Sequence, residues 1–387
     1  MVSRPLRVEE LAEFLAFDFD AGQIPKYHED WRLEDPVEAV LTTCSTLLSL
    51  VNSENSPVIQ FSHFSVKEFL TSARFAEKCT TISSRYHVSM ASAHALVAKA
   101  CLGILLHLDK DITRDALPKF PLAEYAAKHW FEHARLEGVS QNAEEGMTRM
   151  FDRRKPHLAV WLWICDPTIP IWDRERNNQK ERPLTPHGSP LHYAGFCGLY
   201  NVAKVLAAEH PQDVNSRGFI GEETPLHLTS QVGHVDLARL LIEHGANVAA
   251  QSEDGTTPLH VASGEGHVDL ARFLIEHGAD VAAQSKDATT PLHGASVGGH
   301  VDLARLLIEH GASAAAQSKG GTTPLHWASH YGHVDLARFL IEHRADAAAQ
   351  SKDGTTPLDW ASRCGHVNLA RLLIEHGTDA AAPVSQI

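Results

Sequence analysis

TPLHVASGEGHVDLARFLIEHGADVAAQSKD, residues 257–287, is one copy of a pattern that fills the second half of this 387-residue chain. The tetrapeptide TPLH begins at Thr224, Thr257, Thr290 and Thr323, and a TPLD variant begins at Thr356, always 33 residues apart. A weaker copy, SPLH, begins at Ser189. A period of this length indicates stacked supersecondary units. We expect six of them, at about 186–220, 221–253, 254–286, 287–319, 320–352 and 353–387.

Each unit has the signals of two short antiparallel helices. Thr257 is a good N-cap, and Pro258 suits the first helical turn, where a missing N–H costs nothing. Gly266 separates the helices, and residues 270–274 begin an apolar stripe on the second one. Gly278 closes that helix at a position suited to a left-handed cap. The second half is therefore expected to be an α-solenoid in which stacking neighbours build the core.

This pattern resembles the ankyrin repeat, over about 200 residues. The resemblance implies that the histidine of TPLH bonds to the backbone of the loop joining neighbouring units. Asp359 departs from that histidine, which suits a last unit with no neighbour to bond. Arg344 also departs, because it stands where the other well-matched units have glycine (Gly245, Gly278, Gly311 and Gly377). A side chain in a left-handed cap costs roughly 1 kcal/mol, so this turn is predicted to be the weakest.

The copies differ mainly in their first helix, whereas their second helices are nearly identical. The resemblance implies that the first helices and turn tips line a concave face that binds another protein. We therefore predict a protein-binding surface there; the alternatives are drift at unconstrained positions and, for the two tryptophans, simple packing. The candidate residues are Tyr193, Phe196, Leu228, Gln231, Val261, Glu265, Val297, Trp327, His330, Tyr331, Trp360 and Arg363.

The first 165 residues have no repeat, but they have helical and strand signals. Helices are expected over Leu6 to Phe17 and Asp35 to Cys44, followed by a hairpin of 47–51 with 58–64 and a helix over 66–72. This order predicts a winged-helix-like domain at 1–82. Two further helical stretches, FPLAEYAAKHWFEHA and PHLAVWLWICDP, indicate a helical connector at 83–165, and a charged, proline-rich linker follows at 166–185.

The segment FSHFSVKEFL, residues 61–70, resembles one found just after the nucleotide-binding NACHT module of fungal NLR-like (STAND) proteins. The helical stretches after it resemble the connector of the same family. The resemblance implies the ligand-sensing end of an immune or self/non-self receptor, in which His63 matches a histidine that can touch bound nucleotide. A packed histidine is the alternative.

No GxxxxGK[ST] loop occurs, so the chain lacks the family's NTPase, and nucleotide could act only through a NACHT/NLR-type protein in trans. The chain is then either a truncated relative working with such a partner or an incomplete gene product. A second hypothesis is a free-standing cytoplasmic ankyrin adaptor or scaffold. A third is an enzyme with an unfamiliar site in residues 1–165, for which the sequence has no catalytic motif.

Charge and composition exclude several classes of partner. The formal net charge is −14, and residues 186–387 hold 12 Lys and Arg against 22 Asp and Glu. Residues 1–80 hold 7 basic and 13 acidic side chains, so neither part suits nucleic acid, even though many winged helices bind DNA. The apolar run from Ala95 to Leu108 contains Lys99 and is shorter than a bilayer span, and the N-terminus lacks a secretory signal.

Cysteine and histidine usage predicts neither disulfides nor a metal site. Six scattered cysteines without a CxxC pair indicate reduced thiols, and with the missing signal they favour a cytoplasmic protein. His129 and His133 are spaced i, i+4, but no third ligand is evident, and two of the trio His326, His330 and His333 are repeat positions. We expect no catalytic residue, cofactor or metal.

Overall fold

The structure, a computed structural model, describes residues 6–32, 35, 48–53, 56–61, 90–136, 139–169, 186–218 and 221–380. The chain divides into two compact units, residues 1–186 and 187–387.

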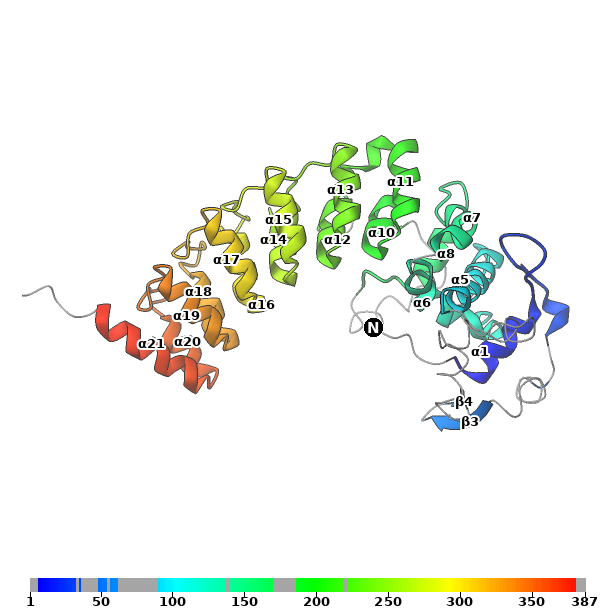
Figure 1. The fold of residues 1–387 in the computed structure, drawn as a ribbon, viewed down its shortest axis with the longest axis horizontal. Helices are drawn as coiled ribbons and strands as arrows, with labels where there is room; N and C mark the ends of the chain where they lie inside the picture. Colours follow the sequence, from blue (N-terminus) through cyan, green and yellow to red (C-terminus); the bar gives the residue numbers. More distant parts are fainter. Residues whose placement is uncertain are drawn as a thin grey trace, which may run out of the picture. The chain divides into compact units, whose positions relative to one another are not determined.

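The described part of the second unit consists of helix pairs that follow one another along the chain (Figure 1). The first helix of each pair, called inner below, is α10 (Pro190–Cys197), α12 (Pro225–Val232), α14 (Pro258–Glu265), α16 (Pro291–Gly298), α18 (Pro324–Tyr331) or α20 (Pro357–Arg363). The second, called outer, is α11 (Tyr200–Glu209), α13 (Val235–Glu243), α15 (Val268–Glu276), α17 (Val301–Glu309), α19 (Val334–Glu342) or α21 (Val367–Ala380).

The predicted helix signals act where expected. Thr257 caps α14 by accepting a hydrogen bond from the His260 N–H, and Pro258 occupies the first turn. Gly266 ends α14 in the left-handed conformation (φ 81°), which turns the chain into α15. In α15 the apolar stripe is buried, with Leu270 and Leu274 fully covered. In this pair the local sequence signals therefore coincide with the ends of α14.

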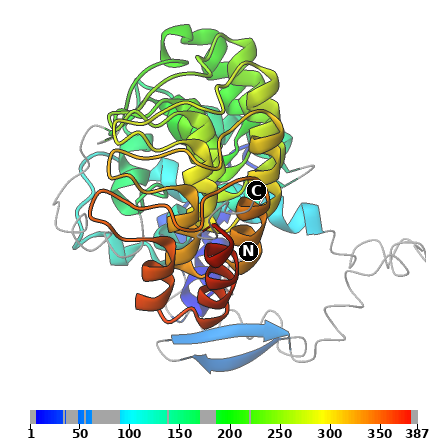
Figure 2. The ribbon, with the colours of Figure 1, turned by 90° about the vertical axis from the view of Figure 1, so that its left-hand side faces the viewer.

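The inner helices approach one another more closely than the outer helices do. Small side chains permit this approach: Ala262, Ala295 and Ala328 are fully buried at equivalent positions. An array that is packed more tightly on one side must bend toward that side. Figure 1 shows α10, α12 and α14 along the inner side of the curve, with α11, α13 and α15 outside them. Figure 2 shows the loops between successive pairs stacked along one edge of the array; we call these loops the fingers.

One position of the outer helices alternates between leucine and phenylalanine, with a period of two pairs. Phenylalanine occurs in α15 and α19, at Phe273 and Phe339, where α13 and α17 have leucine. The guanidinium carbon of Arg239 lies 4.6 Å from the centre of the Phe273 ring, and that of Arg305 lies 4.9 Å from the Phe339 ring. These cation–π contacts join α13 to α15 and α17 to α19.

The described part of the first unit is mainly helical. Its helices are α1 (Val8–Glu13), α5 (Met90–His107), α6 (Pro121–Ala134), α7 (Ser140–Met150) and α8 (His157–Ile164), with short 3-10 turns at Phe14–Ala16, Glu29–Trp31 and Leu117–Lys119. Its strands form two antiparallel hairpins, β1 (Phe17–Asp18) with β2 (Lys26–Tyr27) and β3 (Leu48–Ser53) with β4 (Ser56–Phe61).

A buried carboxylate fastens α1 to the rest of this unit. Glu13 is only 4% exposed; its Oε1 accepts hydrogen bonds from Tyr27 Oη and Arg32 Nη2, and its Oε2 accepts from the Leu122 N–H at 2.5 Å. The last bond caps the N-terminus of α6, where negative charge is favoured. Helix α1 precedes the predicted boundary at residue 82, and α6 follows it, yet the two helices are in contact.

Several N-terminal expectations are met, and others need correction. The hairpin and both helical stretches of the connector are present as β3–β4, α6 and α8. The first helix, however, does not reach Phe17: α1 ends at Glu13, a 3-10 turn follows, and Phe17 opens β1, where its ring lies 5.1 Å from that of Tyr27. The helices predicted at 35–44 and 66–72, His63 and most of the 166–185 linker lie outside the described residues.

Helix α5 corrects the length argument about membranes. It begins at Met90, so its 18 residues, with a mean hydropathy of 1.4, are long and apolar enough to cross a bilayer by length and composition. A buried core helix passes the same test. In α5, Ala98, Cys101 and Ile104 are fully buried, and the helix packs on α6 and α7. Packing inside this unit therefore accounts for its apolar character.

Candidate functional site

Buried histidines tie each helix pair to the next. In α14 the Thr257 N–H donates to His260 Nδ1 (3.1 Å), so this nitrogen carries no proton, and His260 Nε2–H donates to the Thr289 carbonyl (3.0 Å). Equivalent bonds reach from His192, His227, His293 and His326 to the carbonyls of Glu223, Thr256, Thr322 and Thr355. Burial lowers the pKa of all five, to about 4 for His227 and His293, which keeps them neutral.

A second set of histidines, directly before the outer helices, bonds back to the inner helix of the preceding pair. His267 Nε2 lies 3.1 Å from the Gln231 carbonyl oxygen, and His333 Nε2 lies 3.1 Å from that of Val297. His300 and His366 make the same contact to Gly264 and His330. All these acceptors are backbone atoms at the end of an inner helix, where the copies differ most.

The fingers are joined through backbone atoms too. The Lys319 N–H donates to the Asp287 carbonyl (2.7 Å), and the Lys352 N–H donates to the Gly320 carbonyl (2.9 Å). The bonds of the second histidine set thus use the backbone at positions whose side chains vary. These bonds do not depend on the exposed side chains of Gln231, Val297 and His330, which leaves those side chains available for recognition.

Three of the variable residues form an aromatic cluster on α18 and α20, which we call the aromatic patch: Trp327, Tyr331 and Trp360. The rings of Trp327 and Trp360 meet edge to face, with their centres 5.4 Å apart. The Tyr331 ring stacks on that of Trp327, with 6.5 Å between the ring centres. Tyr331 is 47% exposed, and the tryptophans are half-buried. His330 is exposed beside the patch, with its ring 5.6 Å from Trp360. Exposed aromatic residues on a rigid support are the type enriched in binding hot spots.

The other predicted residues divide by exposure. Gln231, Glu265, Val297 and Arg363 are exposed, whereas Phe196 and Val261 are half-buried. Tyr193 and Leu228 need correction as surface residues, because they are 0% and 2% exposed. Their position, directly after the TPLH histidine, faces the neighbouring inner helix, as the Trp327–Trp360 contact at the same position shows.

Comparison with known proteins identifies the array. The family model for ankyrin repeats matches in three overlapping copies, over residues 191–285, 226–318 and 292–383. Residues 191–383 are ankyrin repeats. The ankyrin fold is typically a non-enzymatic module for protein–protein interaction.

Two curated relatives share part of the chain. The "Azaphilone pigments biosynthesis cluster protein L" of Monascus ruber is 27% identical over 263 residues, which are 64% of this chain and 53% of the relative. Alpha-latrocrustotoxin-Lt1a of Latrodectus tredecimguttatus is 37% identical over 65 residues, 17% of this chain and 4% of the toxin. The match thus spans about half of the first relative and a small fraction of the second.

The ankyrin loops hold three side chains, Glu222, Ala288 and Arg344, in the left-handed region that favours glycine. Arg344 has φ 72°, like Gly245, Gly278 and Gly311 at equivalent positions, as its place in the repeat predicts. Gly377 does not belong to that group: α21 continues through it to Ala380. Sequence reasoning missed Glu222 (φ 51°) and Ala288 (φ 55°), which stand where the remaining fingers have Gly255, Gly321 and Gly354. For Ala288 the signal was the replacement of DGT by DAT in an otherwise repeated finger.

The histidine clusters have structural partners. His133 Nδ1 lies 2.7 Å from His94 Nδ1, and His133 Nε2 lies 2.9 Å from Tyr125 Oη, while His129 pairs with Glu132. Within the described residues no three His, Cys, Asp or Glu side chains are grouped so that they could hold a metal ion. Asp359, which replaces the TPLH histidine, accepts from the Thr356 N–H and so keeps the helix cap.

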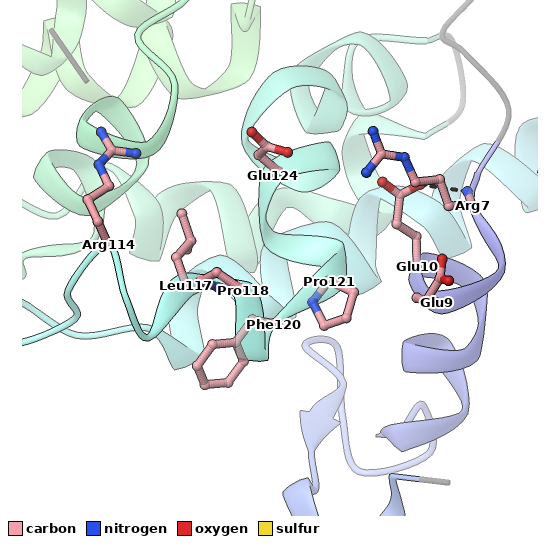
Figure 3. A pocket seen from close by; sticks show the side chains of 9 residues that line it. All are labelled: Arg7, Glu9, Glu10, Arg114, Leu117, Pro118, Phe120, Pro121 and Glu124. Carbon is pink, nitrogen blue, oxygen red and sulfur yellow. Dashed lines mark hydrogen bonds between the residues drawn. The ribbon is translucent and has the colours of Figure 1, made fainter. Parts of the chain in front are cut away.

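The first unit contains a cavity of about 680 Å³ beside α1 and α6 (Figure 3). Its lining combines apolar Leu117, Pro118, Phe120 and Pro121 with Arg7, Arg114, Glu9, Glu10 and Glu124. Two of these carboxylates have structural roles: Glu10 accepts from the Arg7 N–H (2.7 Å), and Glu124 pairs with Lys128 (3.5 Å). Among the described residues that line the cavity there is no cysteine, histidine or serine, and so no nucleophile–base pair of the usual kind.

Proposed function

We propose that the protein recognises another protein through the inner-helix face of its ankyrin array, with the aromatic patch as the main anchor. The observation that supports this most is that the bonds of the second histidine set end on backbone atoms at variable positions. These bonds therefore do not depend on the exposed side chains there. Trp327, Tyr331 and Trp360 then supply large, rigid contact area at one place on the curve.

We further propose that this array is the sensor end of an NLR-like receptor whose NTPase is on another polypeptide or on a longer product of the same gene. The support is the likeness of residues 61–70 and of the α6–α8 region to the segments that follow a NACHT module. In this proposal the first unit passes the binding event to a NACHT-type partner in the cytoplasm. No P-loop sequence occurs in the chain, so any nucleotide would be bound by that partner.

The competing function is a free-standing adaptor whose first unit docks a different protein. An immunoblot of the native polypeptide with an antibody to the repeats separates the possibilities. A band much heavier than 42.4 kDa supports a longer receptor. A band at that mass with a NACHT-type protein co-purifying supports action in trans, and the same band without one supports the adaptor.

Site-specific photo-crosslinking tests recognition through the inner face. A photoreactive phenylalanine analogue at Tyr331 on α18 is compared with the same analogue at Glu342, an exposed residue on α19 of the same pair. Protein adducts should form from position 331 and not from 342. Adducts from 342 alone would place recognition on the outer face and reject the proposal.

A further inference from the structure

The inner-helix face changes its charge along its length. At the second and third pairs the exposed finger and helix-end residues are acidic, with Glu253, Asp254 and Glu265. From the fourth pair onward, lysine occupies each described finger, at Lys286, Lys319 and Lys352, and Arg363 ends α20. This basic end stands out on a unit whose net charge is about −10.

The basic end coincides with the aromatic patch. Trp360 Nε1–H donates to Thr355 Oγ1 (2.9 Å), and Thr355 belongs to the finger that carries Lys352. Arg363 is three residues beyond Trp360 on the same helix. Lys352 and Arg363 therefore flank Trp360: Lys352 lies in the finger to which the Trp360 ring is bonded, and Arg363 lies on the same helix.

The carboxylates nearest to the lysines make their hydrogen bonds elsewhere or stay at a distance. Asp353 accepts hydrogen bonds from Ser351 Oγ and Thr355 Oγ1, which lower its pKa; it stays charged, but its oxygens are held within the finger and form no ion pair with Lys352. Asp287 is the only acidic side chain beside Lys286 at its finger tip, and Asp359 serves the cap of α20 while lying near Arg363. Among the residues that the structure describes, neither Lys319 nor Lys352 has a carboxylate within 4.0 Å.

We propose that the partner segment on the aromatic patch is an acidic peptide with an aromatic or large aliphatic anchor residue. This inference rests on the proposed recognition by the inner face. The anchor would pack on Trp327 and Tyr331, and its flanking carboxylates would face Lys319, Lys352 and Arg363. Glu253, Asp254 and Glu265 repel acidic residues at the other end, so the acidic part of the segment must lie over the last pairs.

Selection of peptides tests the proposed chemistry. A phage-displayed library of random short peptides is panned on the full chain, and enriched sequences are synthesised for titration at low and at physiological salt. The enriched peptides should be net acidic, contain an aromatic or large aliphatic residue, and bind more weakly as salt rises. Tyr331→Ala, at an exposed position, should weaken them about tenfold.

A charge-reversal pair distinguishes local from overall charge. The double variant K319E/K352E should weaken the acidic peptides about tenfold at low salt. The control K204E/R371E makes the same change in net charge at exposed positions of α11 and α21, and it should leave binding within about twofold. Equal losses in both variants would overturn the proposal.

The remaining outcomes separate the two levels of the hypothesis. Enriched peptides that are basic or uncharged, and whose binding is lost in Tyr331→Ala, would overturn the acidic-partner inference while supporting recognition by the inner face. Peptides that bind Tyr331→Ala and K319E/K352E as well as the unaltered chain would count against both.

Discussion

The Nε2 atom of His293 lies 3.2 Å from the carbonyl oxygen of Thr322, which precedes the next helix pair. Its other ring nitrogen accepts from the Thr290 N–H at 3.0 Å. One neutral imidazole therefore caps its own helix and holds the following pair. Because both ring nitrogens are bonded, protonation or removal of this imidazole should change the free energy of unfolding.

Removal of this imidazole should destabilise the array. His293→Ala leaves the Thr290 N–H and the Thr322 carbonyl without their partner, which costs about 1 to 3 kcal/mol for each buried polar group left unsatisfied. Urea unfolding followed by circular dichroism measures the loss. His310→Ala, at an exposed position on the same helix pair, is the control and should stay within about 0.5 kcal/mol. Equal effects of the two substitutions would contradict the bonding role.

Acid should weaken the array between pH 6.5 and about 4. Burial lowers the pKa of His227 and His293 from 6.5 to about 4, so the unfolded chain binds more protons than the folded chain in this window. Stability is therefore full above pH 6.5 and falls as the pH drops toward 4. Urea midpoints at a series of pH values measure the slope, which should be shallower in His293→Ala. A midpoint that does not change across the window would disprove the assignment.

Glycine at position 344 should stabilise the array. Arg344 is held at φ 72°, and relief of this left-handed side-chain strain gains roughly 1 kcal/mol. The reciprocal change, Gly311→Arg, should cost a similar amount, because nothing lies within 4 Å of a Cβ added there. Thermal unfolding of the two variants provides the comparison. A stabilising Gly311→Arg would show that the backbone angle does not decide the effect.

Two left-handed glycines should differ in their tolerance of alanine. A Cβ added at Gly299 would meet the ring of His333 at 2.5 Å, whereas one at Gly311 meets open space. Gly311→Ala should therefore cost roughly 1 kcal/mol for the backbone alone. Gly299→Ala should cost about 1 to 3 kcal/mol more for the overpacking. Urea midpoints compare them, and equal costs would mean that the His333 ring moves aside freely.

Loss of the aromatic patch should abolish most of the recognition without unfolding the array. Changing Trp327, Tyr331 and Trp360 together to alanine should weaken partner binding by more than about tenfold, because such residues dominate binding energy. Isothermal titration with the crosslinked partner measures the affinity. Circular dichroism must show an intact fold, and Glu342→Ala, at an exposed position of the outer helix α19, is the control. Unchanged affinity in the folded triple variant would reject the inner-face site.

The periodic half of the fold was predictable because its signals are local. Thr257, Pro258 and Gly266 specify helix start and end within ten residues, and the copies repeat those signals. The solvent exposure of individual site residues was harder to predict from the sequence. Tyr193 and Leu228 share a sequence position with Trp327, yet they are buried because coverage depends on the side chains of neighbouring pairs.

Non-local bonds limited prediction in the first unit. The sequence indicates the hairpin and the helices α6 and α8, but not that Glu13 accepts from the Leu122 N–H, 109 residues away. Likewise, the variable face was visible by comparing copies. Only the structure shows that His267 and His333 bond to the backbone carbonyls of Gln231 and Val297.

The alternation of leucine and phenylalanine in the outer helices indicates how the array arose. Arg239 with Phe273 and Arg305 with Phe339 mark the same two-pair block twice, and the simplest origin of this rhythm is duplication of that block. Val261 in the first block then corresponds to Trp327 in the second, and Glu265 corresponds to Tyr331. On this origin the duplicated blocks kept one scaffold while their inner-face side chains diverged, and the aromatic side chains occur in the second block alone.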